Sequence, residues 1–142
     1  MKISTKGRYA LRMIVDLAIH QGQNFITLND IAKRQNISKK YLEQIIVLLN
    51  SLKIFKANRG FQGGYKLAIE PKDISVASVL KITEGSINPV ACLDDNPNAC
   101  ERCQECYTLP VWKGLSEVIN NYLENTSIQD ILDNKVNLNQ IN

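Results

Sequence analysis

The stretch of residues 27–69 constrains the fold most, because two capped helices are followed at once by a glycine-rich hairpin. Thr27 is a favourable N-cap for a short helix expected over about residues 28–34. Ser38 caps a second helix expected over about residues 39–52. The apolar residues of that helix recur at three-to-four spacing and form one buried stripe: Leu42, Ile45, Ile46, Leu48, Leu49 and Leu52. Two helices joined by a tight turn predict a helix-turn-helix, although helix pairs also occur in proteins that do not bind DNA.

A hairpin follows this helix pair directly. Residues 54–58 and 65–69 have the composition of two strands, and the segment RGFQGG lies between them. Its glycines permit the positive φ values of a hairpin and leave little bulk beside a partner: Gly60, Gly63 and Gly64. They do not fit a nucleotide-binding loop, because no strand-to-helix switch and no Gly-Lys-Ser/Thr follows. A basic hairpin after a helix-turn-helix predicts a wing.

Three further helices complete a mainly α fold with a small β-hairpin wing. They are expected over about residues 4–21, 76–84 and 109–125, and a last short turn runs to Leu132. The apolar stripe of the long helix is too wide for one contact: Val111, Trp112, Leu115, Val118, Ile119, Tyr122 and Leu123. We therefore expect one side to pack on its own domain and the other to pair with a second subunit.

This pattern divides the chain into four regions. A winged helix-turn-helix domain is expected at residues 1–85 and a cysteine-rich, cluster-binding loop at 86–107. A dimerisation helix is expected at 108–132 and a flexible tail at 133–142.

The net charge of +3 conceals an uneven distribution. Residues 1–72 hold 13 Lys/Arg against 4 Asp/Glu, a net of +9, whereas residues 73–142 hold 4 against 10, a net of −6. This asymmetry suggests that only one half meets a polyanion, and the alternative is two solvated faces that happen to differ. No apolar run approaches the roughly 20 residues of a membrane span, and the N-terminus lacks a signal-peptide pattern. We therefore expect a cytoplasmic protein without membrane contact.

The second helix of the pair carries the first group of candidate DNA contacts. Lys39 and Lys40 lie in its first turn, where the helix dipole disfavours cations and phosphates would offset that cost. Neighbouring side chains at the same end can reach phosphates or base edges: Ser38, Tyr41, Glu43 and Gln44. The alternative is an ordinary solvated helix face.

The wing and the N-terminus supply the other candidates. Arg59, at the wing tip, can enter a narrow minor groove, where the negative potential is strongest. The rest of the wing candidates are Gly60, Gln62, Gly63 and Gly64. An N-terminal group would approach the DNA backbone, unless it is merely a frayed basic end: Lys2, Thr5, Lys6, Arg8 and Tyr9.

All four cysteines lie within fifteen residues: Cys92, Cys100, Cys103 and Cys106. In a reducing compartment such a cluster is more often a metal or redox site than a set of disulfides. The spacing of the last three resembles three-quarters of a bacterial ferredoxin motif, with Pro110 at the fourth position. Four thiolates suit zinc as well as an iron–sulfur cluster, and a thiol-based sensor or free thiols remain alternatives.

Several stretches together resemble the Rrf-two family of IscR, NsrR and CymR regulators. They are MKISTKGRYALRMIVDLA, DIAKRQNISKKYLEQI, RGFQGGYKLA, SVLKITEG and PVACL, and the resemblance covers about residues 1–132. It implies homodimers that bind partly palindromic double-stranded operators through helix and wing. In many members it also implies an iron–sulfur cluster that sets DNA affinity. Other members carry no cluster and work through a protein partner or redox chemistry.

The resemblance implies three cluster ligands in this chain. Cys106 lies six residues before Trp112, Cys100 lies six before Cys106, and Cys92 follows Pro-Val-Ala, as in the family's cluster-bearing members. The chain departs from that pattern because the gap after Cys92 is two residues longer and Cys103 is additional. Leu109 stands where some relatives place a histidine ligand, so the fourth ligand is open and Cys103 is a further candidate.

The sequence thus predicts a DNA-binding transcriptional regulator, expected to be a repressor, that senses iron–sulfur, redox or nitrosative status. A 2Fe–2S cluster is favoured over a 4Fe–4S cluster. The alternative is a cluster-free or zinc-containing regulator controlled by a protein partner or by thiol oxidation. An electron-transfer protein or redox enzyme would leave the basic half unused, and the chain shows no nucleophile–base pair or cofactor loop, so no enzyme activity is expected.

Overall fold

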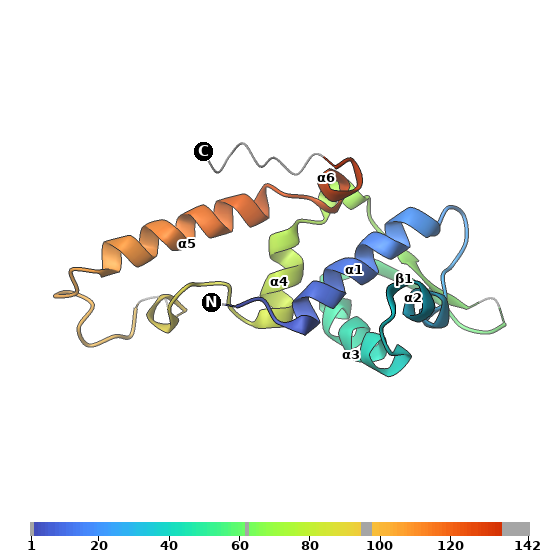
Figure 1. Cartoon of the computed structure of the whole chain (residues 1–142), viewed down its shortest axis with the longest axis horizontal. Coiled ribbons are helices and arrows are strands. Elements are labelled where there is room, and N and C mark those ends of the chain that lie inside the picture. Colours follow the sequence, from blue (N-terminus) through green and yellow to red (C-terminus); the bar gives the residue numbers. More distant parts are fainter. Residues whose placement is uncertain (1, 62, 95–97, 135–142) are drawn as a thin grey trace.

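The computed structural model describes residues 2–61, 63–94 and 98–134 of the 142-residue chain (Figure 1). It has six α-helices in this part: α1 Thr5–His20, α2 Leu28–Gln35, α3 Lys39–Leu49, α4 Val76–Glu84, α5 Leu109–Glu124 and α6 Ile128–Leu132. Strands β1 Phe55–Asn58 and β2 Gly64–Leu67 form a two-stranded antiparallel sheet. Short 3-10 turns lie at Asn50–Leu52, Pro71–Asp73 and Ala91–Leu93. The predicted fold class, mainly α with a hairpin wing, is confirmed.

Hydroxyl side chains begin most of the described helices, as the sequence predicted for Thr27 and Ser38. Each accepts a hydrogen bond from a backbone N–H in the first turn of its helix, which satisfies a donor that the helix leaves free. These N-caps are Thr27 for α2, Ser38 for α3, Ser75 for α4 and Ser127 for α6. Helix positions predicted from periodicity therefore agree with the structure to within a few residues.

Two predicted boundaries were wrong at their C-terminal ends. The α-helical part of α3 stops at Leu49, and a 3-10 turn continues to Leu52 because Lys53 adopts a left-handed φ of 54° and reverses the chain. Strand β2 ends at Leu67 rather than at residue 69. β1 begins at Phe55, which pairs with Leu67, and beyond this pair the Ala68 N–H still donates to the Ile54 carbonyl at 2.7 Å.

The core lies where α1 crosses the α2–α3 pair. The buried stripe of α1 packs against the inner faces of α2 and α3, and its fully buried members include Met13, Ile14 and Leu17. Burying a side chain of this size contributes about 1.5–3 kcal/mol. This packing fixes α3 relative to α1 and leaves the polar face of α3 outside.

Helix α5 projects away from this body, as Figure 1 shows. None of its residues is fully buried, and its contact with the body is made near its C-terminal end, where Leu123 packs beside Val76, Leu80 and Ile87. In the part of the chain that is described, no helix is both long and apolar enough to cross a membrane.

Candidate nucleic-acid interface and cysteine loop

The first turn of α3 presents the predicted polar side chains. Its first turn holds no acidic residue, and the side chains of Lys39, Lys40 and Gln44 are exposed. Glu43 is also exposed, with its Oε1 3.8 Å from Lys39 Nζ, a pairing that contributes little at a solvated surface. The opposite face is anchored in the core by Leu42, Ile45 and Leu49. The start of α3 is thus a rigid platform with a basic outer face.

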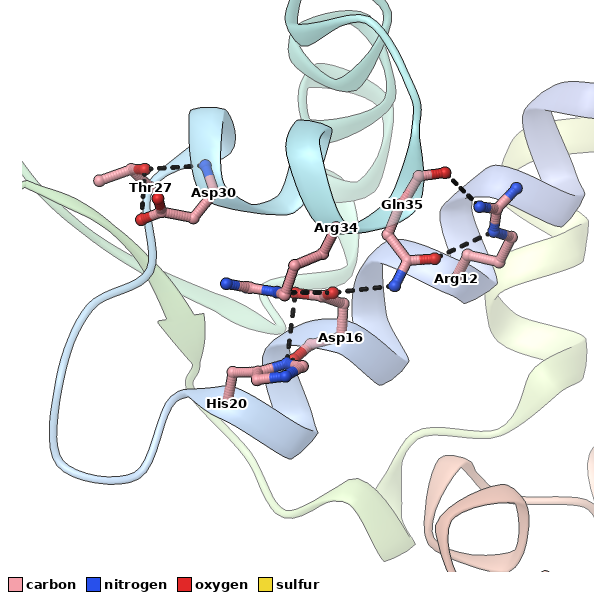
Figure 2. A network of polar contacts seen from close by, with 7 residues as sticks. All are labelled: Arg12, Asp16, His20, Thr27, Asp30, Arg34 and Gln35. Carbon is pink, nitrogen blue, oxygen red and sulfur yellow. Dashed lines mark hydrogen bonds and ion pairs between the residues drawn. The ribbon is translucent and has the colours of Figure 1, made fainter.

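A buried carboxylate on α1 ties the helix-turn-helix together (Figure 2). The Asp16 side chain is 0% exposed and accepts hydrogen bonds from Arg34 Nη2 at 2.6 Å, Arg34 Nε at 3.0 Å and Gln35 Nε2 at 2.8 Å. Burial alone would raise the pKa of Asp16. The hydrogen bonds from Arg34 and Gln35 and the charge of Arg34 outweigh burial, so this pKa lies below its usual value. Asp16 therefore holds the end of α2 as a carboxylate.

The same network continues to the start of α3. Arg12 Nε donates to Gln35 Oε1 at 3.1 Å, and its Nη2 donates to the Gln35 carbonyl oxygen. The Arg12 guanidinium lies 5.1 Å from the centroid of the Tyr9 ring, whose edge meets Tyr41 of α3 at 5.8 Å between centroids. The turn between the two helices passes through Asn36, which has a left-handed φ of 52°. The angle between α2 and α3 is therefore held from α1 by polar as well as apolar contacts.

Sequence reasoning did not single out this network, although one signal was present. Asp16 occupies a position on the apolar face of α1, between Met13 and Leu17. A carboxylate on a buried face requires a buried partner, because an unpaired charge there is costly. The sequence cannot say which of several arginines is that partner.

The wing is a tight hairpin attached firmly at its base. Tyr65 exchanges two backbone hydrogen bonds with Ile26, at 2.7 and 2.8 Å, and the Leu67 N–H donates to the side chain of Gln21 at 2.6 Å. A Cβ at Gly63 would lie 2.7 Å from the Asn58 carbonyl oxygen, so only glycine fits this turn. In Figure 1 the hairpin points away from α5.

The wing tip carries Arg59 and Gly60, both exposed, whereas Gly63 and Gly64 are half-buried at its base. The predicted contact at Gln62 lies outside the described residues. Phe61 is fully exposed at the tip, and sequence reasoning passed over it. Its position between the hairpin glycines Gly60 and Gly63 was the sequence feature that could have indicated an exposed aromatic side chain.

The N-terminal candidates line the start of α1. Lys2, Thr5 and Arg8 are exposed, and Lys6 and Tyr9 are half-buried. Because Tyr9 contacts Tyr41, this group lies next to the start of α3. The structure therefore brings the α3 and N-terminal candidates together on neighbouring elements and places Arg59 on the projecting wing.

The four cysteines are all unpaired thiols, with Cys100 exposed and the others half-buried. Among the described residues, no three Cys, His, Asp or Glu side chains are grouped closely enough to hold a metal ion. The predicted ligand set is thus not assembled in this conformation. Cys100 and Cys103 share one turn, in which the Cys103 N–H donates to the Cys100 carbonyl at 3.0 Å. Cys92 lies in another turn, where Asn88 Nδ2 donates to the neighbouring carbonyl of Leu93 at 2.9 Å.

The chemistry of the donor set nevertheless fits a soft metal centre, since four thiols lie on one loop. Cys106 precedes the first turn of α5, and its Sγ lies 3.4 Å from Thr108 Oγ1. Hydrogen bonds from the Thr108 side chain and backbone, together with the charge of Arg102, lower the pKa of Cys106. A lowered pKa favours the thiolate, which is the form that binds metal or reacts with oxidants.

The Rrf2 (Rrf-two) family model, described as iron-dependent transcriptional regulator, matches residues 3–134. The HTH-type transcriptional regulator IscR of Aliivibrio salmonicida is 34% identical over 96% of this chain and 80% of its own length. The HTH-type transcriptional regulator CymR of Bacillus subtilis is 34% identical over 92% of this chain and 89% of its own.

Solved structures give the same result. The structure of T. potens IscR superimposes with a TM-score of 0.74 at 35% identity, covering 94% of this chain and 88% of that one. The structure of CymR, the global cysteine regulator of B. subtilis, gives a TM-score of 0.70 at 34% identity, covering 92% and 95%. The helix-turn-helix, the wing and the long helix described above are therefore those of a family of transcriptional regulators rather than enzymes, and this chain belongs to the Rrf2 family of winged-helix, DNA-binding transcriptional regulators.

Proposed function

We propose that this protein is a cytoplasmic, homodimeric repressor that binds a partly palindromic duplex operator and senses iron–sulfur, redox or nitrosative status. The observation that carries the proposal is the basic, acid-free first turn of α3 on a half-chain with a net charge of +9. In this division, residues 1–85 bind DNA, residues 86–107 hold the sensing centre and residues 108–132 dimerise.

The proposed docking follows from the geometry of the basic elements. The start of α3 enters the major groove, where Glu43 and Gln44 can reach base edges. The wing places Arg59 in the adjacent minor groove. The N-terminal end of α1 contacts phosphates. The proposed contact residues are Lys2, Thr5, Lys6, Arg8, Tyr9, Ser38, Lys39, Lys40, Tyr41, Glu43, Gln44, Arg59, Gly60, Gln62, Gly63 and Gly64.

The experiment that tests DNA binding starts from random-sequence duplex DNA. Repeated selection on the purified full chain should enrich a partly palindromic sequence, because a two-fold dimer presents two equal half-sites. Footprinting on the enriched duplex should show two protected half-sites, separated by one turn of the DNA helix or by a multiple of it. Failure to enrich any sequence would contradict the proposed operator binding.

The exposed apolar side of α5 supports dimerisation through that helix. Val111, Leu115 and Val118 are 61%, 42% and 66% exposed and lie on a helix with no fully buried residue. An amphipathic helix whose apolar stripe faces water is stabilised by pairing with a second copy.

We expect Val118→Glu to convert the dimer to a monomer, because the charge would have to be desolvated in the α5–α5 contact. Sedimentation equilibrium measures the mass. Val47→Glu is the matched control, since Val47 is similarly exposed, at 70%, but lies on α3. The control should remain a dimer; a dimeric Val118→Glu variant would exclude this face as the interface.

In the sensing loop, we propose that Cys92, Cys100 and Cys106 hold an iron–sulfur cluster, with Cys103 as the additional candidate ligand. A 2Fe–2S cluster is favoured over 4Fe–4S, and zinc is the alternative metal. A bound cluster supplies a centre that oxidants and nitric oxide can destroy. The chain's own contribution is to favour the thiolate form of Cys106 through Thr108 and to attach the Cys92 turn to α5 through Asn88 and Ser116.

Optical absorption of anaerobically purified protein checks this assignment. Wild type should absorb between about 300 and 500 nm, because iron–sulfur clusters absorb there and zinc does not. Cys92→Ser, Cys100→Ser and Cys106→Ser should each remove the bands, and Cys103→Ser tests the fourth position. Loss of zinc on chelation, without visible bands, would instead identify a zinc regulator. Retention of the bands in all three single variants would show that the ligand set is wrong.

A specific observation also favours a second candidate, a cluster-free regulator. The cysteines are not gathered among the described residues, and the pKa of Cys106 is lowered. Such a regulator would respond through thiol oxidation or through a protein partner. A related CymR, that of Staphylococcus aureus, has a solved structure in an oxidized form. Metal-free protein whose DNA affinity falls on mild oxidation, and recovers with a thiol reductant, would favour this candidate.

A further inference from the structure

A carboxylate from α4 closes the N-terminal end of α1. The Ser4 N–H donates to Glu84 Oε2 at 3.2 Å, and the Ser4 hydroxyl donates to Glu84 Oε1 at 2.7 Å. The same hydroxyl accepts from the Gly7 N–H at 3.2 Å and so caps the helix. Because α1 has no acidic residue in its own first turn, Glu84 supplies from another helix the negative charge that a helix N-terminus attracts.

Gly7 makes room for this contact. A Cβ at position 7 would overlap Glu84 Oε1 and would lie 3.1 Å from Leu80 and 3.2 Å from the hydroxyl of Thr83. Gly7 is buried and its φ is that of an ordinary helix, so nothing in its backbone conformation requires glycine. Glycine at position 7 therefore leaves the space that the Glu84 carboxylate occupies.

The residues around this contact are cationic. Lys2 precedes Ser4 outside the helix, and Lys6 and Arg8 follow it in the first turn. All three are proposed phosphate contacts. Holding Ser4 fixes the direction in which the chain between Lys2 and Lys6 leaves the domain, and the orientation of these cations depends on that direction.

Glu84 also stands at the start of the cysteine loop. It is the last residue of α4, and Gly85, with a φ of +79°, turns the chain into the segment that leads to Cys92. In that segment Asn88 accepts a hydrogen bond from the Ser116 hydroxyl of α5 at 2.6 Å. Residues 84–94 therefore touch the start of α1, carry Cys92 and contact the long helix.

We propose that Glu84 is a positioning residue for DNA binding, which holds the N-terminal segment of α1 so that Lys2 and Lys6 meet phosphates. This inference rests on the proposed function. It adds that the N-terminal grip on DNA is set by a residue at the boundary of the sensing loop, which touches no DNA itself.

The test uses three full-length variants and a labelled duplex selected from random DNA by the wild type. Glu84→Gln removes a negative charge, so charge alone would tighten binding; we expect about tenfold weaker binding instead. Gly7→Ala changes no charge and displaces the carboxylate, so it should have the same effect. Glu70→Gln is the control, since Glu70 is exposed and the change in charge is identical. This control should bind as tightly as wild type or more tightly.

The slope of log affinity against log salt separates positioning from a general loss of structure. If Lys2 and Lys6 no longer contact phosphates, the slope should become shallower by about two per protomer. Partial unfolding would instead lower the active fraction of protein and leave the slope unchanged. Amide exchange should accelerate at Gly7 and not in the core of α1. Wild-type affinity and slope in both Glu84→Gln and Gly7→Ala would overturn the proposal and leave the proposed function intact. Absence of binding by the wild type would overturn both.

Discussion

Replacing Asp16 with asparagine is expected to lower the free energy of unfolding by about 3 kcal/mol. The Asp16 side chain is 0% exposed and the Arg34 side chain only 34% exposed, so the change leaves a partly buried guanidinium without its counter-charge. It also replaces a carboxylate oxygen that accepts from Arg34 or Gln35 with an amide that donates. Urea denaturation, with the midpoint shifted and the m-value unchanged, measures the loss.

Asp73→Asn is the matched control for this change. Asp73 is exposed in a surface turn, and we expect its replacement to alter stability by less than about 0.5 kcal/mol. An Asp16→Asn variant as stable as this control would show that the network is not a source of stability. Operator affinity should also fall, because the network holds α2 against α3.

The effect of Asp16 depends on pH in a defined direction. Because its pKa is lower in the folded than in the unfolded chain, the unfolded state takes up the proton first as the solution is acidified. Its contribution is complete above the ordinary Asp pKa of about 3.9 and disappears as the pH falls through the folded value. The stability difference between wild type and Asp16→Asn should be constant near neutral pH and should shrink in acid below about pH 4.

Arg59→Ala is expected to weaken operator binding by about tenfold or more, equivalent to about 1.4 kcal/mol or more, with little change in stability. Arg59 is exposed on a hairpin tip and has no role in the core. A guanidinium in a narrow minor groove lies where the DNA potential is most negative, so its loss should cost most at A·T-rich flanks. Fluorescence anisotropy on the selected duplex and on a G·C-flanked version measures both effects.

Lys72→Ala controls for the loss of one positive charge. Lys72 is exposed in the turn Pro71–Asp73, which packs beside α6. The Lys72→Ala variant should weaken binding far less than Arg59→Ala does, and by the same amount on the selected duplex and on its G·C-flanked version. Equal effects of the two variants would remove the wing tip from recognition.

Local rules predicted the framework well because capping and periodicity are local. Thr27 and Ser38 each mark a helix start that the structure confirms, and the glycines of the wing predict a turn that a Cβ would obstruct. The family resemblance agreed with these elements and is confirmed by the comparisons.

What could not be predicted depends on tertiary pairing. Asp16 is a charged residue on an apolar face, and only the packing of α1 on α2 selects Arg34 as its partner. Glu84 and Ser4 are eighty positions apart, so no sequence period connects them. Whether the four cysteines come together also depends on tertiary structure. Their spacing predicts one ligand set, and this stays a prediction: no three potential ligands are gathered among the described residues, although Cys100 and Cys103 share a turn.

Salt-dependent binding to duplex DNA tests the central assignment most directly. The intact protein would be titrated with its selected duplex at a series of salt concentrations. The expected result is an affinity that falls linearly on a log–log plot, with a slope of about −0.9 for each phosphate neutralised by the basic half. An affinity that is absent for every duplex, or that does not change with salt, would contradict recognition of DNA by the face built from α3, the wing and the start of α1.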